Sequence, residues 1–136
     1  MKLSIIIPAK NEEGNLEKTI EEINNILLKN NIQHEIIVIN DHSSDATLKI
    51  LNLLKNNIHE LKIINNTGKP GYGFTVRLGL ENYSGEIIAI MMADGSDSPK
   101  DLIKFYFKSI KNNTCIFGSR FIEGGSTKDY PKLKYV

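Results

Sequence analysis

Short apolar runs alternate along the chain with longer segments in which apolar residues recur every three or four positions. The runs of strand length cover residues 3–7, 35–40, 61–64, 86–91 and 114–117. The apolar residues between the first two runs are Leu16, Ile20, Ile23 and Leu27. This spacing is that of one face of an amphipathic helix, and its alternation with strands is typical of repeated βαβ units. The pattern predicts an α/β fold, a three-layer α/β/α domain with a mostly parallel, Rossmann-like sheet.

Individual residues predict where these elements begin and end. Pro8 should close the first strand, because proline cannot donate to a strand ladder. Ser44 or Asp45 can cap the second helix, and Pro99 suits the first turn of the fourth. The third helix follows a glycine-rich segment, and its apolar residues are Phe74, Val76, Leu78 and Leu80. The order of elements is therefore β-α-β-α-β-α-β-α-β.

The composition narrows the class of protein. With 136 residues and 40% hydrophobic content, the chain suits one domain with one core. The net charge is only +1 and both signs are interspersed, so a nucleic acid is not the expected partner. The apolar stretch at residues 3–8 is too short for a signal peptide or for the ~20 residues of a membrane span. These features predict a cytoplasmic location.

The cysteine and the histidines give little sign of chemistry. Cys115 is the only cysteine and lies in an apolar run, which predicts a buried, inert thiol in a reducing compartment. His34, His42 and His59 are scattered without the spacing of metal ligands. Surface or loop positions are expected for them.

Four polar segments lie at or just beyond the carboxyl ends of predicted strands, which is the side on which open α/β sheets bind ligands. They are residues 8–14, 40–47, 68–73 and 94–99. Taken singly, the first fits an acidic strand–helix loop and the second an Asx turn before a helix cap. The third could cradle phosphate through backbone amides or could be only a flexible turn. Their shared position favours one ligand site over four separate loops.

Two of these segments carry the most informative carboxylates. Asp41 sits where an acidic side chain can accept hydrogen bonds from a nucleobase or ribose. Asp94 and Asp97 stand at the end of an apolar strand, where carboxylates are unfavourable without a cation or donors nearby. Hard oxygen ligands at the mouth of a parallel sheet indicate a metal and diphosphate site.

The order of these segments resembles that of family 2 glycosyltransferases. The likeness is carried by residues 4–12, 38–47, 91–99 and 118–121, and is closest to the dolichol-phosphate and polyprenyl-phosphate sugar synthases. This resemblance implies a GT-A fold, a UDP- or GDP-sugar donor, a Mg²⁺ or Mn²⁺ ion and inversion at the anomeric carbon. The implied acceptor is a polyprenyl phosphate or a glycan.

The resemblance also assigns roles to residues. The implied nucleotide-binding residues are Pro8, Ala9, Asn11, Glu12, Asp41 and Gly73. Asp94 matches the last aspartate of the family's Asp-x-Asp motif and would hold the cation, with Asp97 as a further metal ligand. Arg120 matches an arginine that contacts the acceptor phosphate, so Asp94 and Arg120 are the implied catalytic residues. An anionic phosphate acceptor needs no strong general base.

Two departures from the family pattern open alternatives. Met92 replaces the first aspartate of the motif, so Asp97 or Ser96 would supply the absent ligand. The sequence also stops at Val136, so residues 1–136 are expected to form a single donor-binding domain without its acceptor portion. A missing segment of this kind would give peripheral association with the cytoplasmic face of a membrane. The alternative function is a truncated, non-catalytic nucleotide-sugar-binding module. A nucleotidyltransferase fits less well, because residues 8–12 lack its glycine-rich basic signature.

Overall fold

The computed structural model describes residues 1–119, which contain a four-stranded sheet. The strands are β1 (Leu3–Ala9), β2 (His34–Asn40), β3 (Leu61–Asn65) and β4 (Ile87–Ile90). Their order across the sheet is β3-β2-β1-β4, and each neighbouring pair is parallel. The prediction of an α/β fold with a mostly parallel sheet is confirmed.

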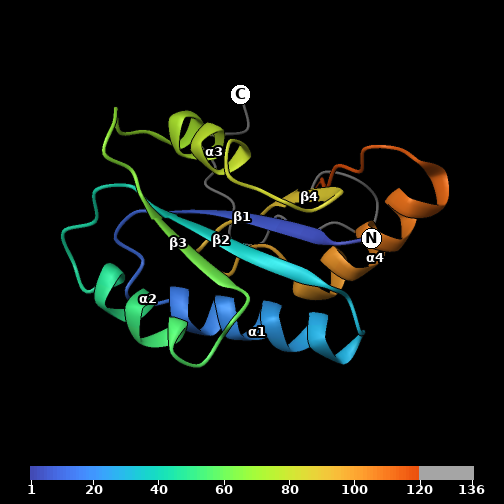
Figure 1. Ribbon diagram of the computed structural model, residues 1–136, viewed down its shortest axis with the longest axis horizontal. Coiled ribbons are helices and arrows are strands. Elements are labelled where there is room, and N and C mark those ends of the chain that lie inside the picture. The colour runs from blue at the N-terminus through green and yellow to red at the C-terminus, as the bar shows by residue number, and fades with distance from the viewer. Residues whose placement is uncertain (120–136) are drawn as a thin grey trace.

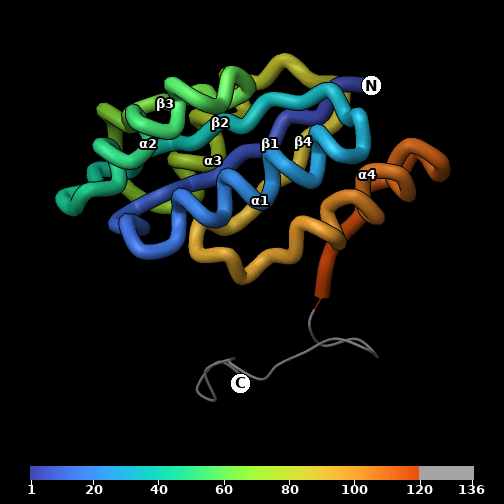
Figure 2. Tube along the Cα trace, turned by 90° about the horizontal axis from the view of Figure 1, so that it is seen from below, coloured from blue at the N-terminus to red at the C-terminus, as the bar shows by residue number. Residues whose placement is uncertain are grey.

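Within the described residues, four helices complete the layers. They are α1 (Leu16–Lys29), α2 (Thr47–Lys55), α3 (Tyr72–Leu80) and α4 (Pro99–Asn112). Figure 1 shows α1 and α2 beneath the sheet and α3 above it, which confirms the three-layer arrangement. Figure 2, seen from below, shows α1 across the sheet with α4 beside it. Within residues 1–119, no helix is both long and apolar enough to cross a membrane.

The main core lies between the sheet and the helices α1 and α2. The four apolar residues predicted for the first helix, Leu16, Ile20, Ile23 and Leu27, are all fully buried there. Nearly every residue of β1 and β2 is buried as well, as expected for central parallel strands covered on both faces. Burial of each such side chain contributes about 1.5–3 kcal/mol, so this core fixes the position of the loops at both ends of the strands.

The third helix packs only partly through the apolar residues named for it: Leu78 packs against the sheet, but two of the others are exposed. Phe74 is 45% and Leu80 is 40% exposed, whereas Thr75 and Gly79 are buried. A Cβ atom added at Gly79 would lie 2.5 Å from Ile6 Cγ2. The helix therefore approaches the sheet closely, and only a small residue fits at the contact. The apolar residues of the sequence thus identified the helix and one packing residue, Leu78, but not the small residues at its closest contact with the sheet.

The prediction that Pro8 ends β1 is wrong, because the strand runs through Pro8 to Ala9. Ile6 accepts the N–H of Met91 on the β4 side of the strand, and Ala9 accepts the N–H of Asp41 on the β2 side. By this alternation the nitrogen of Pro8 faces the β4 side. Strand β4 stops at Ile90, the partner of Ile6, so no ladder bond is lost at Pro8.

The predicted fifth strand at 114–117 is also absent, since residues 114–119 are not part of the sheet. Cys115 is exposed, which corrects the expectation of a buried thiol. Strand β4 is an edge in this part of the chain and is only half buried, because α3 packs mainly over β1 and β2. Ile88 and Ile90 are 37% and 46% exposed, although their run was expected to be a buried strand.

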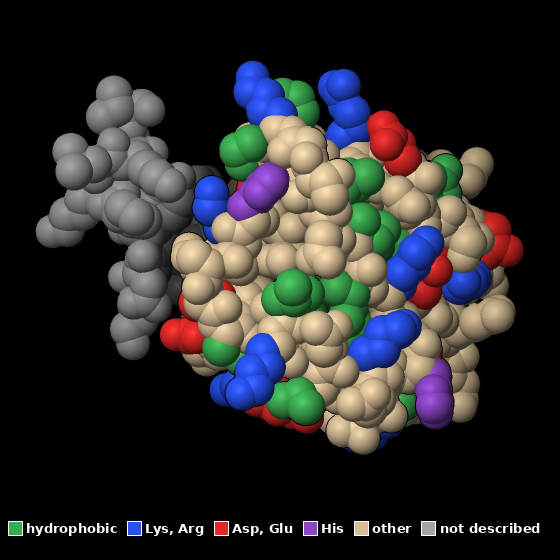
Figure 3. Space-filling view, turned by 60° about the vertical axis from the view of Figure 1, so that its left-hand side comes forward, with side chains coloured by type: hydrophobic (Ala, Val, Ile, Leu, Met, Phe, Trp, Pro, Cys, Tyr) green, Lys and Arg blue, Asp and Glu red, His purple; other side chains and the backbone are tan. Residues whose placement is uncertain are grey.

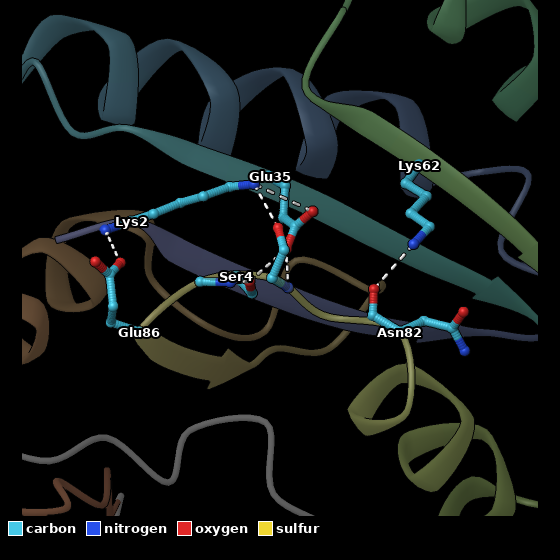
Figure 4. A network of polar contacts seen from close by, with 8 residues as sticks. Lys2, Ser4, Glu35, Lys62, Asn82 and Glu86 are labelled. Carbon is cyan, nitrogen blue, oxygen red and sulfur yellow. Dashed lines mark hydrogen bonds and ion pairs between the residues drawn. The ribbon is translucent and has the colours of Figure 1, made fainter.

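A polar network joins the amino ends of the strands. Glu35 accepts hydrogen bonds from the Ser4 hydroxyl at 2.6 Å and from the Ser84 N–H at 2.7 Å, and Lys2 Nζ lies 3.5 Å from its other oxygen. Figure 4 shows the side chains of Lys2, Ser4 and Glu35 converging where β1 and β2 begin. The Ser4 hydroxyl also accepts the N–H of Gly85 at 2.9 Å. This network holds the segment before β4 against β1 and β2.

Candidate functional site

The loops that follow β1 and β2 are hydrogen-bonded to each other at the carboxyl end of the sheet. The N–H of Asn11 donates to the Ser43 hydroxyl at 3.0 Å, and the Asn11 side-chain oxygen accepts the N–H of Ser44 at 2.8 Å. Asn11 has a φ of 54°, a left-handed conformation that asparagine tolerates better than most residues. Neighbouring parallel strands deliver both loops to one place, and Asn11 joins them.

The two acidic residues after Asn11 continue this connection. The N–H of Glu12 donates to the Thr47 hydroxyl at 2.9 Å, and the N–H of Glu13 donates to Asp45 at 3.2 Å. In return, a Glu13 oxygen accepts the N–H of Ala46 at 2.8 Å. Asp45 also accepts the N–H of Thr47, the first residue of α2, at 2.9 Å. The N-cap of α2 is Ala46, so the prediction that Ser44 or Asp45 caps this helix is wrong. Asp45 precedes the cap and bonds to both the helix and the loop after β1.

Asp41 links this pair of loops to the segment before α3. The residue is only 4% exposed. Its Oδ1 accepts a hydrogen bond from Asn66 Nδ2 at 2.7 Å, and its Oδ2 accepts one from the N–H of Gly71 at 2.9 Å. Burial raises the pKa of Asp41, but these two hydrogen bonds and the nearby Lys10 and His42 outweigh it and hold the pKa below its ordinary value. Asp41 is thus a buried, ionised carboxylate at neutral pH.

Asn66 is a site residue that the sequence analysis missed. It lies directly after β3 and is 8% exposed, and its side chain bonds to Asp41, Gly68 and Lys69. The available signal was its position, because it follows a strand as the other polar segments do. The amides of Gly68 and Gly71 donate to Asn66 and Asp41, which leaves the glycine-rich segment a turn held from within. Gly73 is exposed in the first turn of α3.

Asp94 lies on an exposed loop just after β4. Its Oδ1 accepts the N–H of Ser96 at 2.9 Å, and Asp97 Oδ2 accepts the N–H of Met92 at 2.7 Å. The Thr19 hydroxyl of α1 shares its proton between the carbonyl of Asn15 at 3.0 Å and that of Ala93 at 3.1 Å. The buried bond to Ala93 holds the Asp94 loop against α1, next to the loop that carries Glu12.

The carboxylates of Glu12 and Asp94 are close enough for their negative charges to interact. Burial raises the pKa of Glu12, the negative charges of Asp94 and Asp45 raise it further, and a hydrogen bond from Asn15 only partly opposes them. A cation or a donor between these carboxylates would relieve the repulsion. Across residues 1–119, no three or more His, Cys, Asp or Glu side chains are grouped so that they could hold a metal ion by themselves.

The other residues considered in the sequence analysis differ in their burial and in where they lie. Ala9 is 2% exposed inside β1, so it offers the loops its backbone rather than a free side chain. Pro8 is half-buried in the same strand, and Arg120 lies outside the described residues. His42 and His59 are on loops as expected, but His34 is buried and hydrogen-bonded to Asn24 at 2.9 Å. His34 was predicted wrongly because it begins β2, where the strand passes over α1.

A hollow of about 340 Å³ adjoins the Asn66 turn. It lies between that turn and α3 and includes Lys69, Phe74 and Arg77. The Lys69 ammonium stands 5.1 Å from the centre of the Phe74 ring. Figure 3 shows Lys and Arg side chains spread around small apolar areas on one face of the molecule, without one continuous basic stripe.

The geometry thus gathers three strand-end loops and Asp94 at one edge of a parallel sheet. The sequence model of glycosyl transferase family 2 matches residues 4–135. The chain belongs to this family. It is 34% identical over 132 residues to the dolichol-phosphate mannosyltransferase of Pyrococcus furiosus, covering 96% of this chain and 36% of that protein. It is 31% identical to the GalNAc(5)-diNAcBac-PP-undecaprenol beta-1,3-glucosyltransferase of Campylobacter jejuni, covering 95% and 42%.

Solved glycosyltransferase structures share the fold of this family 2 chain. Mannosyl-3-phosphoglycerate synthase from Rubrobacter xylanophilus aligns with a TM-score of 0.67 at 17% identity, over 81% of this chain and 36% of that one. A Pyrobaculum calidifontis mannosyltransferase in complex with GDP-Man and Mn²⁺ aligns with a TM-score of 0.58 at 21% identity, over 68% and 27%. These neighbours have the GT-A fold. The chain spans about two fifths of the length of the curated relatives it matches.

Proposed function

We propose that this chain binds a nucleotide sugar at the carboxyl end of its sheet and serves the transfer of that sugar, with inversion, to a polyprenyl-phosphate or glycan acceptor. The observation that carries the proposal is Asp41, a buried and ionised carboxylate held among three strand-end loops. Family membership and the GT-A fold support the same reading. Relatives named for dolichol-phosphate substrates support the lipid-phosphate acceptor.

The nucleoside would lie against the joined loops after β1 and β2. An ionised carboxylate has about four lone-pair sites, and each oxygen of Asp41 accepts only one hydrogen bond from the protein. The remaining lone pairs can accept N–H or O–H groups of a base or ribose. Asn11 and Glu12 hold the adjacent wall through their bonds to Ser43 and Thr47. The N-termini of α1 and α2 also begin at this edge, which favours an anionic ligand.

The donor groups at Asp94 fit a Mg²⁺ or Mn²⁺ ion that is shared with a diphosphate. Mg²⁺ is commonly held by one or two carboxylates together with substrate phosphates, rather than by a complete set of protein ligands. Asp94 is exposed just after β4, and its negative charge is one of the causes that raise the pKa of Glu12. A bound cation would neutralise charge on the departing nucleoside diphosphate. Both carboxylates accept one backbone amide, but Asp94 is exposed and Asp97 is half-buried, so Asp94 is the principal ligand in this proposal.

The chain's own residues do the positioning. Thr19 holds the Asp94 loop against α1, and Asn66 holds the glycine turn against Asp41. A phosphate acceptor is already anionic and attacks without a strong base. The proposed role of Arg120 is to bind that phosphate, since a guanidinium matches its geometry. We also propose that the reaction takes place at the cytoplasmic face of a membrane.

The cation site is tested by Asp94→Asn. Loss of the charge should weaken metal-dependent binding of UDP or GDP by about 1–3 kcal/mol while the fold survives, because the residue is exposed on a loop. Calorimetric titrations in Mg²⁺ and in Mn²⁺ measure the effect. Asp101→Asn removes an exposed carboxylate that pairs with Lys104 on α4 and serves as the matched control. Equal affinities of the wild type and Asp94→Asn would remove Asp94 from the site.

Met92→Asp provides the reciprocal test. Met92 is 39% exposed, so an aspartate there replaces no core side chain. Restoring the carboxylate that the family motif carries should strengthen Mn²⁺-dependent binding. Unchanged metal affinity in a folded variant would show that position 92 does not face the cation.

Transfer itself is measured by release of nucleoside diphosphate from UDP- and GDP-sugars, with and without polyprenyl phosphate. Turnover that depends on the acceptor supports the transferase. Binding of nucleotide sugar without turnover supports the second candidate, a nucleotide-sugar-binding module, which the substitution at Met92 favours. Absence of binding to any nucleoside diphosphate would contradict both.

A further inference from the structure

Asn66 uses its whole side-chain amide inside the protein. Its Nδ2 donates to Asp41 Oδ1 at 2.7 Å and to the carbonyl of Lys69 at 2.9 Å, and its Oδ1 accepts the N–H of Gly68 at 2.9 Å. Its backbone N–H donates to the carbonyl of Asn40 at 2.9 Å. One residue directly after β3 therefore holds both the Gly68–Lys69 turn and the carboxylate that follows β2.

These bonds fix the orientation of the Asp41 carboxylate, because both of its oxygens are held. The two carboxylate oxygens bind to different groups, Oδ1 to Asn66 and Oδ2 to the N–H of Gly71. Gly71 has a φ of 131°, a conformation that favours glycine, and Asn66 fixes the turn that leads to it. Asn66 thus acts on Asp41 directly through Oδ1 and indirectly through the placement of Gly71.

We infer that Asn66 is a positioning residue for nucleoside recognition: it orients the Asp41 carboxylate and the glycine turn before a ligand arrives. The inference rests on the proposed function and adds a residue and a role to it. Recognition by a preorganised group avoids the cost of ordering that group on binding. The residue does not need to touch the nucleoside. Its loss should therefore weaken binding of the nucleoside moiety and leave binding of the diphosphate nearly unchanged.

Two substitutions separate orientation from charge. Asn66→Ala removes all three side-chain bonds without adding a charge. Asn66→Asp keeps an acceptor for Gly68 but places a second carboxylate beside Asp41, so one of the two must take up a proton or turn away. We expect UDP or GDP, whichever the wild type binds more tightly, to lose about tenfold in affinity with Asn66→Ala. The loss should be larger with Asn66→Asp. Pyrophosphate should change by less than about twofold with either, because Asp41 faces the nucleoside.

A double-mutant cycle shows whether Asn66 acts through Asp41. In the Asp41→Asn background, Asn66→Ala should cause little further loss of nucleoside diphosphate affinity, because the group that it orients has already changed. Asn82→Ala is the matched control, because it also removes a side-chain bond, from Asn82 to the Leu78 carbonyl at 2.8 Å, but Asn82 lies beyond the C-terminal end of α3, away from Asp41. This variant should keep wild-type affinity.

The outcomes distinguish the inference from the proposed function. A wild type that binds no nucleoside diphosphate would overturn the proposed function itself. A wild type that binds while Asn66→Ala binds equally well, or loses UDP and pyrophosphate affinity alike, would overturn only the role of Asn66. Additive losses in the cycle would do the same. If neither Asn66 variant gives a folded protein by circular dichroism, Asn66 is a folding residue and the inference is wrong.

Discussion

Each end of strand β2 carries a hydrogen-bonded carboxylate, but the two carboxylates have different surroundings. Glu35 near its amino end and Asp41 just beyond its carboxyl end are both ionised carboxylates that bind a neighbouring strand or loop. One oxygen of Glu35 accepts three hydrogen bonds, from the Ser4 hydroxyl and from the N–H and hydroxyl of Ser84, and its other oxygen faces Lys2 at 3.5 Å (Figure 4). Asp41 accepts one bond per oxygen, and no ion pair to it is present in residues 1–119.

The difference indicates which end can receive a ligand. A hollow of about 450 Å³ lies at the amino end, larger than the one beside Asn66. Its lysines are already engaged, however, since Lys62 donates to the carbonyl of Asn82 at 2.9 Å and Lys55 donates to that of Leu61. The N-termini of α1, α2 and α3 all lie at the other end, where their dipoles favour an anion. If the ligand site were chosen by the volume of the hollow alone, the wrong end of the sheet would be chosen.

The largest expected effect is on the amino end, with Gly85→Ala. A Cβ atom there would lie 2.7 Å from the Lys2 carbonyl and from the Ser4 hydroxyl, so backbone must move. The variant should lose about 3 kcal/mol of unfolding free energy, measured by urea denaturation. Gly14→Ala is the control, because nothing lies within 4 Å of its added Cβ. Equal stability of the two variants would show that the amino-end network is loosely packed.

Glu35→Gln should have the next largest effect. The substitution replaces a charged acceptor by an amide whose N–H₂ faces other donors, and it should cost about 2 kcal/mol of stability at pH 7. Nucleoside diphosphate affinity should remain unchanged. Glu22→Gln removes an exposed charge 3.8 Å from Lys18 and should cost about 0.3–0.5 kcal/mol at most.

The pH dependence of that variant checks the sign of the effect. Burial raises the pKa of Glu35, but the bonds from Ser4 and Ser84 and the charge of Lys2 lower it more, so the folded pKa lies below 4.5. Its stabilising contribution is therefore present above pH 4.5 and is lost as the pH falls through the folded pKa. The stability gap between wild type and Glu35→Gln should narrow on acidification. A gap that widens would contradict the lowered pKa.

A smaller effect on stability than for Gly85→Ala or Glu35→Gln is expected for Asp41→Asn. An asparagine can still accept the Gly71 N–H, but its N–H₂ group would then face the Nδ2 donor of Asn66, so the unfolding free energy should fall by about 1.5 kcal/mol. Nucleoside affinity should fall further than pyrophosphate affinity, in contrast to Glu35→Gln. An equal loss of affinity for both ligands would instead show that Asp41 only holds the turn in place, a structural role like that of Glu35.

Sequence periodicity was sufficient for elements whose environment is uniform. Leu16, Ile20, Ile23 and Leu27 lie on one helical face, and all four are buried as predicted. It failed where one contact decides the packing, as in α3, where Gly79 rather than Phe74 meets the sheet. It failed also for Cys115 and residues 114–117, since an apolar run becomes a strand only where a neighbouring strand accepts it.

For the candidate site, the sequence by itself determined the carboxylates and their place at strand ends, because parallel strands deliver their following loops to one edge. It also determined the family resemblance that the comparisons confirm. Only the tertiary structure decided that Asn66 orients Asp41, that Thr19 holds the Asp94 loop and that Glu12 lies near Asp94. Those relations join residues 25 to more than 70 positions apart, and such distances are closed by packing of the core rather than by any local pattern.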